Sequence, residues 1–162
     1  MNSFTINKKC TLKGTVQASK AKNATLPLIA AALLTEEDVI INEAPQLLDV
    51  RAMCNIAAKM GARIIISDKR IIINAAHIST GEAVYEDCIQ TRASILVLGS
   101  VLSRLGKAKI AMPGGCSIGN RPIDLHLKGF SQMGADINTK HGNVLAKTKK
   151  LTGAEIYLDF PS

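Results

Sequence analysis

An internal repeat constrains this sequence more than any other feature. A glycine at the start of an apolar, strand-like stretch occurs at Gly14, Gly81 and Gly153, so the spacings are 67 and 72 residues. Self-similarity at a regular period is typical of chains built from copies of one supersecondary unit. We therefore interpret the sequence as two full copies, about 12–79 and 80–150, followed by a third copy that begins at 151.

The two full copies show the same order of expected elements. The first copy has a strand at 11–17, a helix at 23–34, a strand at 38–42, a helix that ends at Met60, and a hairpin of 63–67 with 70–74. The second has a strand at 80–84, a helix at 91–105, a strand at 107–112, a helix that ends at Met133, and a hairpin of 136–139 with 143–147. Apolar residues at helical spacing support the second helix of each copy. Gly61 and Gly134 stand where a helix commonly stops. The predicted fold class is α/β (α+β), with one βαβαββ unit used twice.

Composition describes a globular protein with an aliphatic core. Of the 162 residues, 47% are hydrophobic and 20% are charged. The first helix of each copy is apolar on most sides, at 24–34 and 95–102, which predicts that these helices are buried. The net charge of +7 favours an anionic partner. Aromatic residues make up only 3%, and the chain shows no nucleic-acid motif, so we expect no nucleic-acid partner.

The cysteines and the hydropathy pattern exclude further classes of protein. Cys10, Cys54, Cys88 and Cys116 are widely spaced, with no CxxC pair and no histidine at metal-ligand spacing. We therefore expect no disulfide, no metal and no cofactor, and we interpret Cys54 as inert core. The N-terminus lacks an apolar signal core and no run approaches the length of a membrane span, so we expect a cytoplasmic protein without a membrane partner.

One connection carries a candidate reactive group. The stretch 113–122 contains three glycines, Cys116 and Arg121 between a strand pattern and a helix pattern. Glycines let backbone N–H groups approach a ligand, and a thiol beside a cation and a helix start is a candidate nucleophile or proton donor. The alternative is a glycine-rich connection with an incidental cysteine. The second copy is longer than the first at this place, with 20 positions from Pro113 to Met133 against 15 from Pro45 to Met60, and such insertions often carry function.

Five motifs, in the same order, resemble those of the UDP-N-acetylglucosamine 1-carboxyvinyltransferases, a family related to EPSP synthase. They are Ala21–Ala24 with Leu26-Pro27, Thr91–Ser94, Pro113–Gly119, Arg121–His126 and Asp159–Ser162. The resemblance implies two inside-out α/β domains, each of three βαβαββ units around buried helices, with the active site between them. It assigns 22–162 to an incomplete first domain and the N-terminal segment 1–21 to the second domain. We therefore expect the chain to be the front portion of a longer protein whose C-terminal part is missing here.

The resemblance also implies a reaction and a set of site residues. The family transfers the enolpyruvyl group from phosphoenolpyruvate to the 3′-hydroxyl of UDP-N-acetylglucosamine and releases phosphate, which begins peptidoglycan synthesis and so serves cell-wall biogenesis, cell shape and division. Cys116 corresponds to the proton donor, which fosfomycin alkylates. Lys22 and Asn23 correspond to phosphoenolpyruvate contacts. The residues that correspond to UDP-N-acetylglucosamine contacts are Arg92, Arg121, Pro122, Ile123, Asp124, Leu125 and Ser162.

Each of these assignments has a structural alternative. Lys22 and Asn23 also suit a capped helix with a solvated lysine, Arg92 a surface arginine, and Pro122 with Asp124 an ordinary helix start. The family's base for the hydroxyl proton and its further phosphate-binding arginines would lie in the missing part, so we expect little or no turnover from the 162-residue chain alone. A second hypothesis is a non-catalytic module that binds a nucleotide sugar or another anion.

Overall fold

The computed structural model describes residues 3, 5, 7, 11–113 and 123–158. The helices are α1 (Lys22–Ala32), α2 (Leu48–Lys59), α3 (Tyr85–Cys88), the 3-10 helix η1 (Arg92–Leu96), α4 (Val97–Leu105) and α5 (Asp124–Gln132). The strands are β1 (Asp38–Asn42), β2 (Arg63–Ile66), β3 (Arg70–Asn74), β4 (Glu82–Ala83), β5 (Lys107–Ala111), β6 (Asp136–Lys140) and β7 (Asn143–Lys147). In the described part of the chain, no helix combines the length and the apolar character needed to cross a membrane.

The strands form two sheets with corresponding layouts. The first has the order β1-β3-β2 and the second the order β4-β5-β7-β6. In both, a hairpin pairs antiparallel with the strand that precedes the second helix, so β1, β2 and β3 correspond to β5, β6 and β7. The second sheet has one more strand, β4, which runs parallel to β5. Both predicted hairpins are therefore confirmed.

Alternating side chains direct one face of each sheet toward the helices. In β3, Ile71 and Ile73 are fully buried while Arg70 is exposed. In the second sheet, Ile110 of β5 stands opposite Val144 of β7, and both are fully buried. This two-residue period is the one expected of strands that cover a core with a single face.

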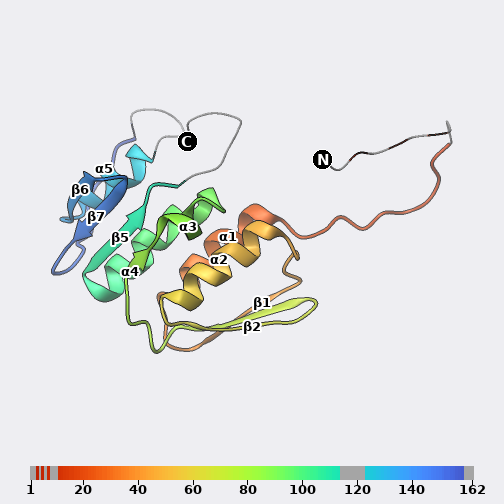
Figure 1. Ribbon diagram of the computed structural model, residues 1–162, viewed down its shortest axis with the longest axis horizontal. Helices are drawn as coiled ribbons and strands as arrows, with labels where there is room; N and C mark the ends of the chain where they lie inside the picture. The colour runs from red at the N-terminus through yellow and green to blue at the C-terminus, as the bar shows by residue number, and fades with distance from the viewer. Residues whose placement is uncertain (1–2, 4, 6, 8–10, 114–122, 159–162) are drawn as a thin grey trace.

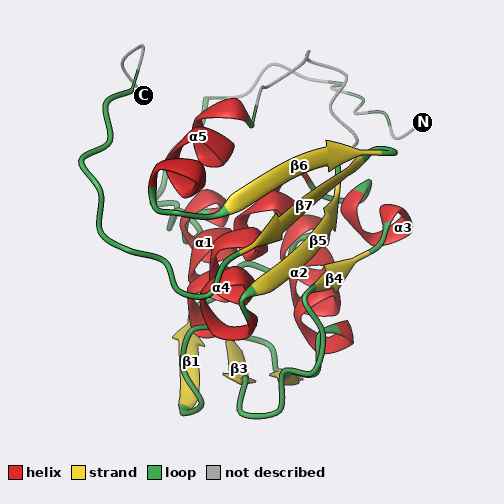
Figure 2. Cartoon of the chain, turned by 90° about the vertical axis from the view of Figure 1, so that its left-hand side faces the viewer, coloured by secondary structure: helices red, strands yellow, loops and turns green. Residues whose placement is uncertain are grey.

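The helices α1, α2 and α4 lie in the middle of the molecule, with the two sheets outside them (Figures 1 and 2). Apart from Thr25 of α1 and Ser100 of α4, their buried side chains are aliphatic or sulfur-containing. Removing each large apolar side chain from water stabilises the fold by about 1.5–3 kcal/mol. The largest of them are Ile29, Met53, Ile56, Leu98 and Leu102, and Leu33, directly after α1, is buried with them. The prediction of buried helices inside sheets is confirmed, with one difference: Leu28 of α1 and Leu34, which follows the helix, are half exposed.

Glycines end the second helix of each copy, as the sequence predicts. Gly61 follows α2 with φ of +108°, and Gly134 follows α5 with φ of +90°, both in the region that favours glycine. At Gly61 a Cβ atom would also lie 2.5 Å from the carbonyl oxygen of His77. A side chain at this position is therefore excluded twice, by backbone conformation and by space.

Two expected strands are absent from the described residues. Residues 11–17 form no strand, and Leu12 and Val16 are 89% and 93% exposed. The apolar stretch at 151–156, which opens the third copy, forms no strand either. A strand requires a partner for its backbone groups, and neither sheet pairs with these segments. Those two predictions are wrong for this structure.

Smaller differences concern the helices of the second copy. The predicted helix at 91–105 is divided into η1 and α4, and the four-residue α3 was not anticipated. The helix expected to open at Pro122 begins at Asp124, and Pro122 itself lies outside the described residues. No residue of α5 is buried. Its apolar residues Leu127 and Phe130 are partly buried and pack against the core.

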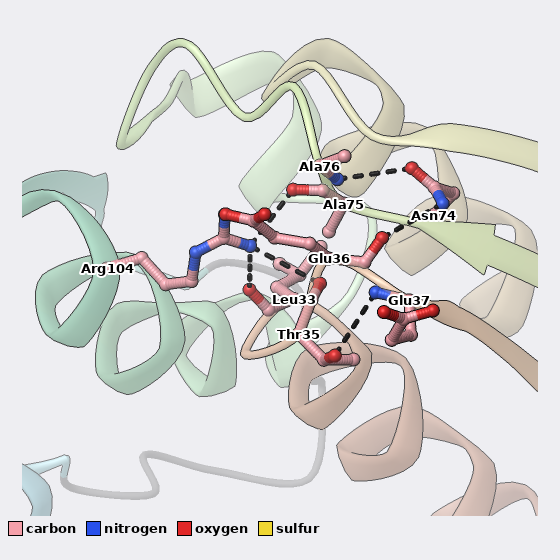
Figure 3. Close-up of polar contacts among 8 residues, drawn as sticks. All are labelled: Leu33, Thr35, Glu36, Glu37, Asn74, Ala75, Ala76 and Arg104. Carbon is pink, nitrogen blue, oxygen red and sulfur yellow. Dashed lines mark hydrogen bonds and ion pairs between the residues drawn. The ribbon is translucent and has the colours of Figure 1, made fainter.

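Arg104 of α4 joins the two copies (Figure 3). Its Nη1 donates to the carbonyl oxygens of Leu33, Thr35 and Ala75 at 3.2, 3.3 and 2.9 Å. Its Nη2 also reaches Glu36 Oε1 at 3.2 Å. One guanidinium thus binds carbonyls that follow α1 and β3 of the first copy, where helix and strand ends leave acceptors unpaired.

Candidate functional site

The first turn of α1 holds two of the expected site residues, Lys22 and Asn23. The residue before the helix, Ala21, supplies no side-chain cap, and its carbonyl oxygen accepts the backbone N–H of Ala24 and of Thr25, each at 3.2 Å. Asn23 is exposed and does not cap the helix. The alternative of a capped helix is therefore not what the structure shows.

Lys22 is held by a residue that the sequence analysis did not identify. Its Nζ donates to Asp49 Oδ2 at 2.5 Å, and the two side chains are 40% and 34% exposed. Asp49 lies in the first turn of α2, so the N-terminal ends of α1 and α2 are adjacent. Lys22 is thus ion-paired and still partly exposed to solvent. An acidic residue in the first turn of a predicted helix was the available signal, but it indicated only helix initiation.

Arg92 is the first residue of η1. The preceding residue, Thr91, caps this element, since its Oγ1 accepts the backbone N–H of Ala93 at 3.3 Å. Arg92 is half buried, and among the described residues its guanidinium makes no ion pair or hydrogen bond. Five N–H donors in a fixed fork are therefore available for a carboxylate or phosphate.

The packing of α4 against α1 places Arg92 toward the end of the molecule that carries Lys22. The Ser100 hydroxyl donates to the carbonyl oxygen of Ala30, and Arg104 donates to that of Leu33, so the two helices run alongside each other in the same direction. Because η1 precedes α4, it lies beside the earlier part of α1, and the two elements are in contact. Among the described residues, no hydrogen bond or ion pair joins Arg92 to Lys22 or Asn23.

The remaining expected contacts are divided between described and undescribed residues. Ile123 is 8% exposed and belongs to the core, Asp124 is exposed in the first turn of α5, and Leu125 is half buried. The other predicted site residues lie outside the described residues, and they are Cys116, Arg121, Pro122 and Ser162.

The two described cysteines lack the environment of a reactive thiol. Cys54 is 3% exposed, and burial raises its pKa to about 11. Cys88 is fully buried, and burial is also the main cause that raises its pKa. Because the thiolate is the reactive form, both thiols are inert at neutral pH. The interpretation of Cys54 as core is confirmed.

The comparisons with known proteins agree first on the class of fold. An enolpyruvyl transferase, NikO from Streptomyces tendae, superimposes with a TM-score of 0.75 over 87% of this chain and 31% of its own, at 21% sequence identity. EPSP synthase from Acinetobacter baumannii gives a TM-score of 0.68 over 92% of this chain and 35% of its own, at 18% identity. The chain therefore has the enolpyruvyl-transferase fold, as the resemblance implied.

Sequence comparison identifies the family to which the chain belongs. The model of the family described as EPSP synthase (3-phosphoshikimate 1-carboxyvinyltransferase) matches residues 6–162, and the chain belongs to this family. UDP-N-acetylglucosamine 1-carboxyvinyltransferase 1 of Caldanaerobacter subterraneus subsp. tengcongensis is 52% identical over 98% of this chain and 38% of its own length. The enzyme named UDP-N-acetylglucosamine 1-carboxyvinyltransferase in a Synechocystis strain is 43% identical over 97% of this chain and 37% of its own length. The chain thus spans well under half the length of these curated relatives.

Proposed function

We propose that this chain is part of a UDP-N-acetylglucosamine 1-carboxyvinyltransferase, which transfers the enolpyruvyl group from phosphoenolpyruvate to the 3′-hydroxyl of the sugar nucleotide and releases phosphate. One observation supports this choice within the family. Seven relatives that carry this name are 41–52% identical to the chain. The solved EPSP synthase and NikO, by contrast, are only 18–21% identical.

The proposed roles follow the resemblance residue by residue. Lys22 and Asn23 bind phosphoenolpyruvate, and the arrangement of Lys22 at two adjacent helix N-termini supports an anion there. Cys116 donates a proton to the methylene carbon while the sugar hydroxyl adds to the neighbouring carbon and gives its proton to the base in the missing part. In the elimination that follows, the new methyl group loses a proton and phosphate leaves. The proposed UDP-N-acetylglucosamine contacts are Arg92, which has no polar partner among the described residues, together with Arg121, Pro122, Ile123, Asp124, Leu125 and Ser162.

The proposal extends to the whole polypeptide. Residues 22–162 are assigned to the first domain and 1–21 to the second, and the reaction requires both. The extended, exposed segment 11–20 supports an assignment of this segment outside the first domain. The activity belongs to peptidoglycan synthesis in the cytoplasm, and fosfomycin is its expected inhibitor.

The test is the intact mass of the chain after exposure to fosfomycin, with and without UDP-N-acetylglucosamine. We expect a single adduct that is promoted by the sugar nucleotide and is absent from the Cys116→Ala variant. Cys54 and Cys88 serve as internal controls, because buried thiols with raised pKa values react slowly. Absence of an adduct, or equal labelling of several cysteines, would mean that this chain does not assemble the proposed site, and it would favour the second candidate.

The second candidate is a non-catalytic nucleotide-sugar or anion-binding module. It is favoured by one observation, that the net charge of +7 suits an anionic ligand without requiring catalysis. This candidate predicts that UDP-N-acetylglucosamine still binds to Cys116→Ala with unchanged affinity while fosfomycin forms no adduct with either variant.

A further inference from the structure

The ion pair between Lys22 and Asp49 connects two helices through their first turns. The partners are 27 positions apart in the sequence. Lys22 is the only charged residue in the first turn of α1, whereas the first turn of α2 holds both Asp49 and Arg51. Neither α1 nor α2 has a side-chain cap, since Ala21 and Leu47 precede them. Both helices therefore present unpaired N–H groups and the positive end of a dipole beside the pair.

The pair leaves hydrogen-bonding capacity on the lysine. An ammonium has three N–H donors, and one of them is directed to Asp49 Oδ2. Both side chains are partly exposed, so a ligand can reach the remaining two donors. A free lysine side chain has many rotamers, and fixing one of them before a ligand arrives removes an entropic cost from binding.

We propose that Asp49 is a positioning residue for Lys22. It holds the ammonium at the adjacent N-termini of α1 and α2 and leaves two donors for the phosphoenolpyruvate anion. This inference rests on the proposed binding of phosphoenolpyruvate at Lys22 and Asn23.

A positioning role and a simple charge effect predict opposite results at this position. A carboxylate close to an anion site repels the anion, so removing its charge without any other consequence would tighten binding. Loss of positioning weakens binding instead, because the ammonium must then be ordered by the ligand itself. The direction of the change in affinity therefore separates the two roles.

The experiment measures phosphoenolpyruvate binding by calorimetry for the wild-type chain and for Asp49→Asn, Asp49→Glu and Lys22→Ala. We expect Asp49→Asn to bind phosphoenolpyruvate about tenfold more weakly. The reason is that this variant loses the one charge-assisted hydrogen bond that fixes the position of the Lys22 ammonium. Asp49→Glu should recover part of this loss, since it retains the carboxylate. Asp38→Asn is the matched control, because it removes a carboxylate from the Arg63–Asp38 ion pair at the first residue of β1.

A second readout follows Lys22 directly. Trace labelling with acetic anhydride, read by peptide mass spectrometry, reports how freely each lysine amine reacts. We expect faster labelling of Lys22 in Asp49→Asn, a rate near that of wild type in Asp49→Glu, and no change in Asp38→Asn. Phosphoenolpyruvate should protect Lys22 in the wild-type chain.

The outcomes distinguish this inference from the proposed function. If Lys22→Ala abolishes binding while Asp49→Asn binds as tightly as wild type or more tightly, the positioning role is wrong and the substrate contact stands. If the wild-type chain shows neither binding nor protection by phosphoenolpyruvate, the proposed contact fails. In that case the labelling decides, and an unchanged rate at Lys22 in Asp49→Asn overturns the positioning role.

Discussion

Asp87 is a buried carboxylate whose partners come from another helix. Its side chain is 5% exposed, and it accepts Lys59 Nζ at 2.7 and 2.9 Å and Asn55 Nδ2 at 3.2 Å. Lys59 and Asn55 lie on α2, so this group ties the second copy to the first. A buried acceptor that has lost its charged partner cannot recover the hydrogen bonds from water.

We expect Asp87→Asn to lower the free energy of unfolding by about 1–3 kcal/mol. The loss stays below the value for a fully buried pair because Lys59 is 56% exposed and can be hydrated again. Urea titration followed by circular dichroism measures the change. Glu82→Gln is the control, since Glu82 and its partner Lys109 are 56% and 49% exposed, and such pairs contribute less than about 1 kcal/mol. Equal losses in the two variants would show that burial of Asp87 is not what matters.

At the scale of elements, the strands that local interactions specify were predicted correctly from the sequence, and the strands that require a distant partner were not. The strand 38–42 and the hairpin strand 143–147 were predicted with the observed bounds, because side-chain alternation and turn residues specify them. The segments at 11–17 and 151–156 have the same apolar pattern, yet they form no strand without a partner to pair with. The roles of Lys22 and Arg92 were expected from the resemblance to a known family. Asp49 was not identified, because its contact with Lys22 joins two helices that are distant in the sequence.

Arg104 of α4 connects two elements, because its side chain binds the end of α1. Replacement by methionine keeps most of the aliphatic stem and removes the donors to Leu33, Thr35 and Ala75. We expect the free energy of unfolding to fall by about 2–4 kcal/mol, because several carbonyl acceptors lose their partner together. Thermal unfolding measures the loss. The control is Glu36→Gln, which touches the same guanidinium from a side chain that is 73% exposed and should change stability little. A loss in Glu36→Gln as large as in the methionine variant would instead assign the stability to the ion pair.

At the scale of the whole molecule, the two copies are equivalent in topology and unequal in burial. Helix α2 buries six residues, whereas the corresponding α5 buries none. Phe130 of α5 lies over Gly99 of α4, where a Cβ atom would come within 2.8 Å of the ring. The docking of α5 onto the rest of the chain therefore depends on the absence of a side chain at Gly99. Elements with few buried contacts open at a lower free energy than the core around them.

The Gly99→Ala variant tests whether α5 opens at a lower free energy than the core helices. Alanine at an interior helix position stabilises α4 by about 1 kcal/mol relative to glycine. The same methyl group displaces the Phe130 ring, so α5 loses part of its contact with α4. We expect hydrogen exchange, read by mass spectrometry, to become faster in 124–132 and to remain as slow or slower in 97–105. The α2 segment, 48–59, is the internal reference and should not change. A uniform change in all three helices would mean that α5 opens only with the whole fold, and that the weaker burial of the second copy has no separate effect on its dynamics.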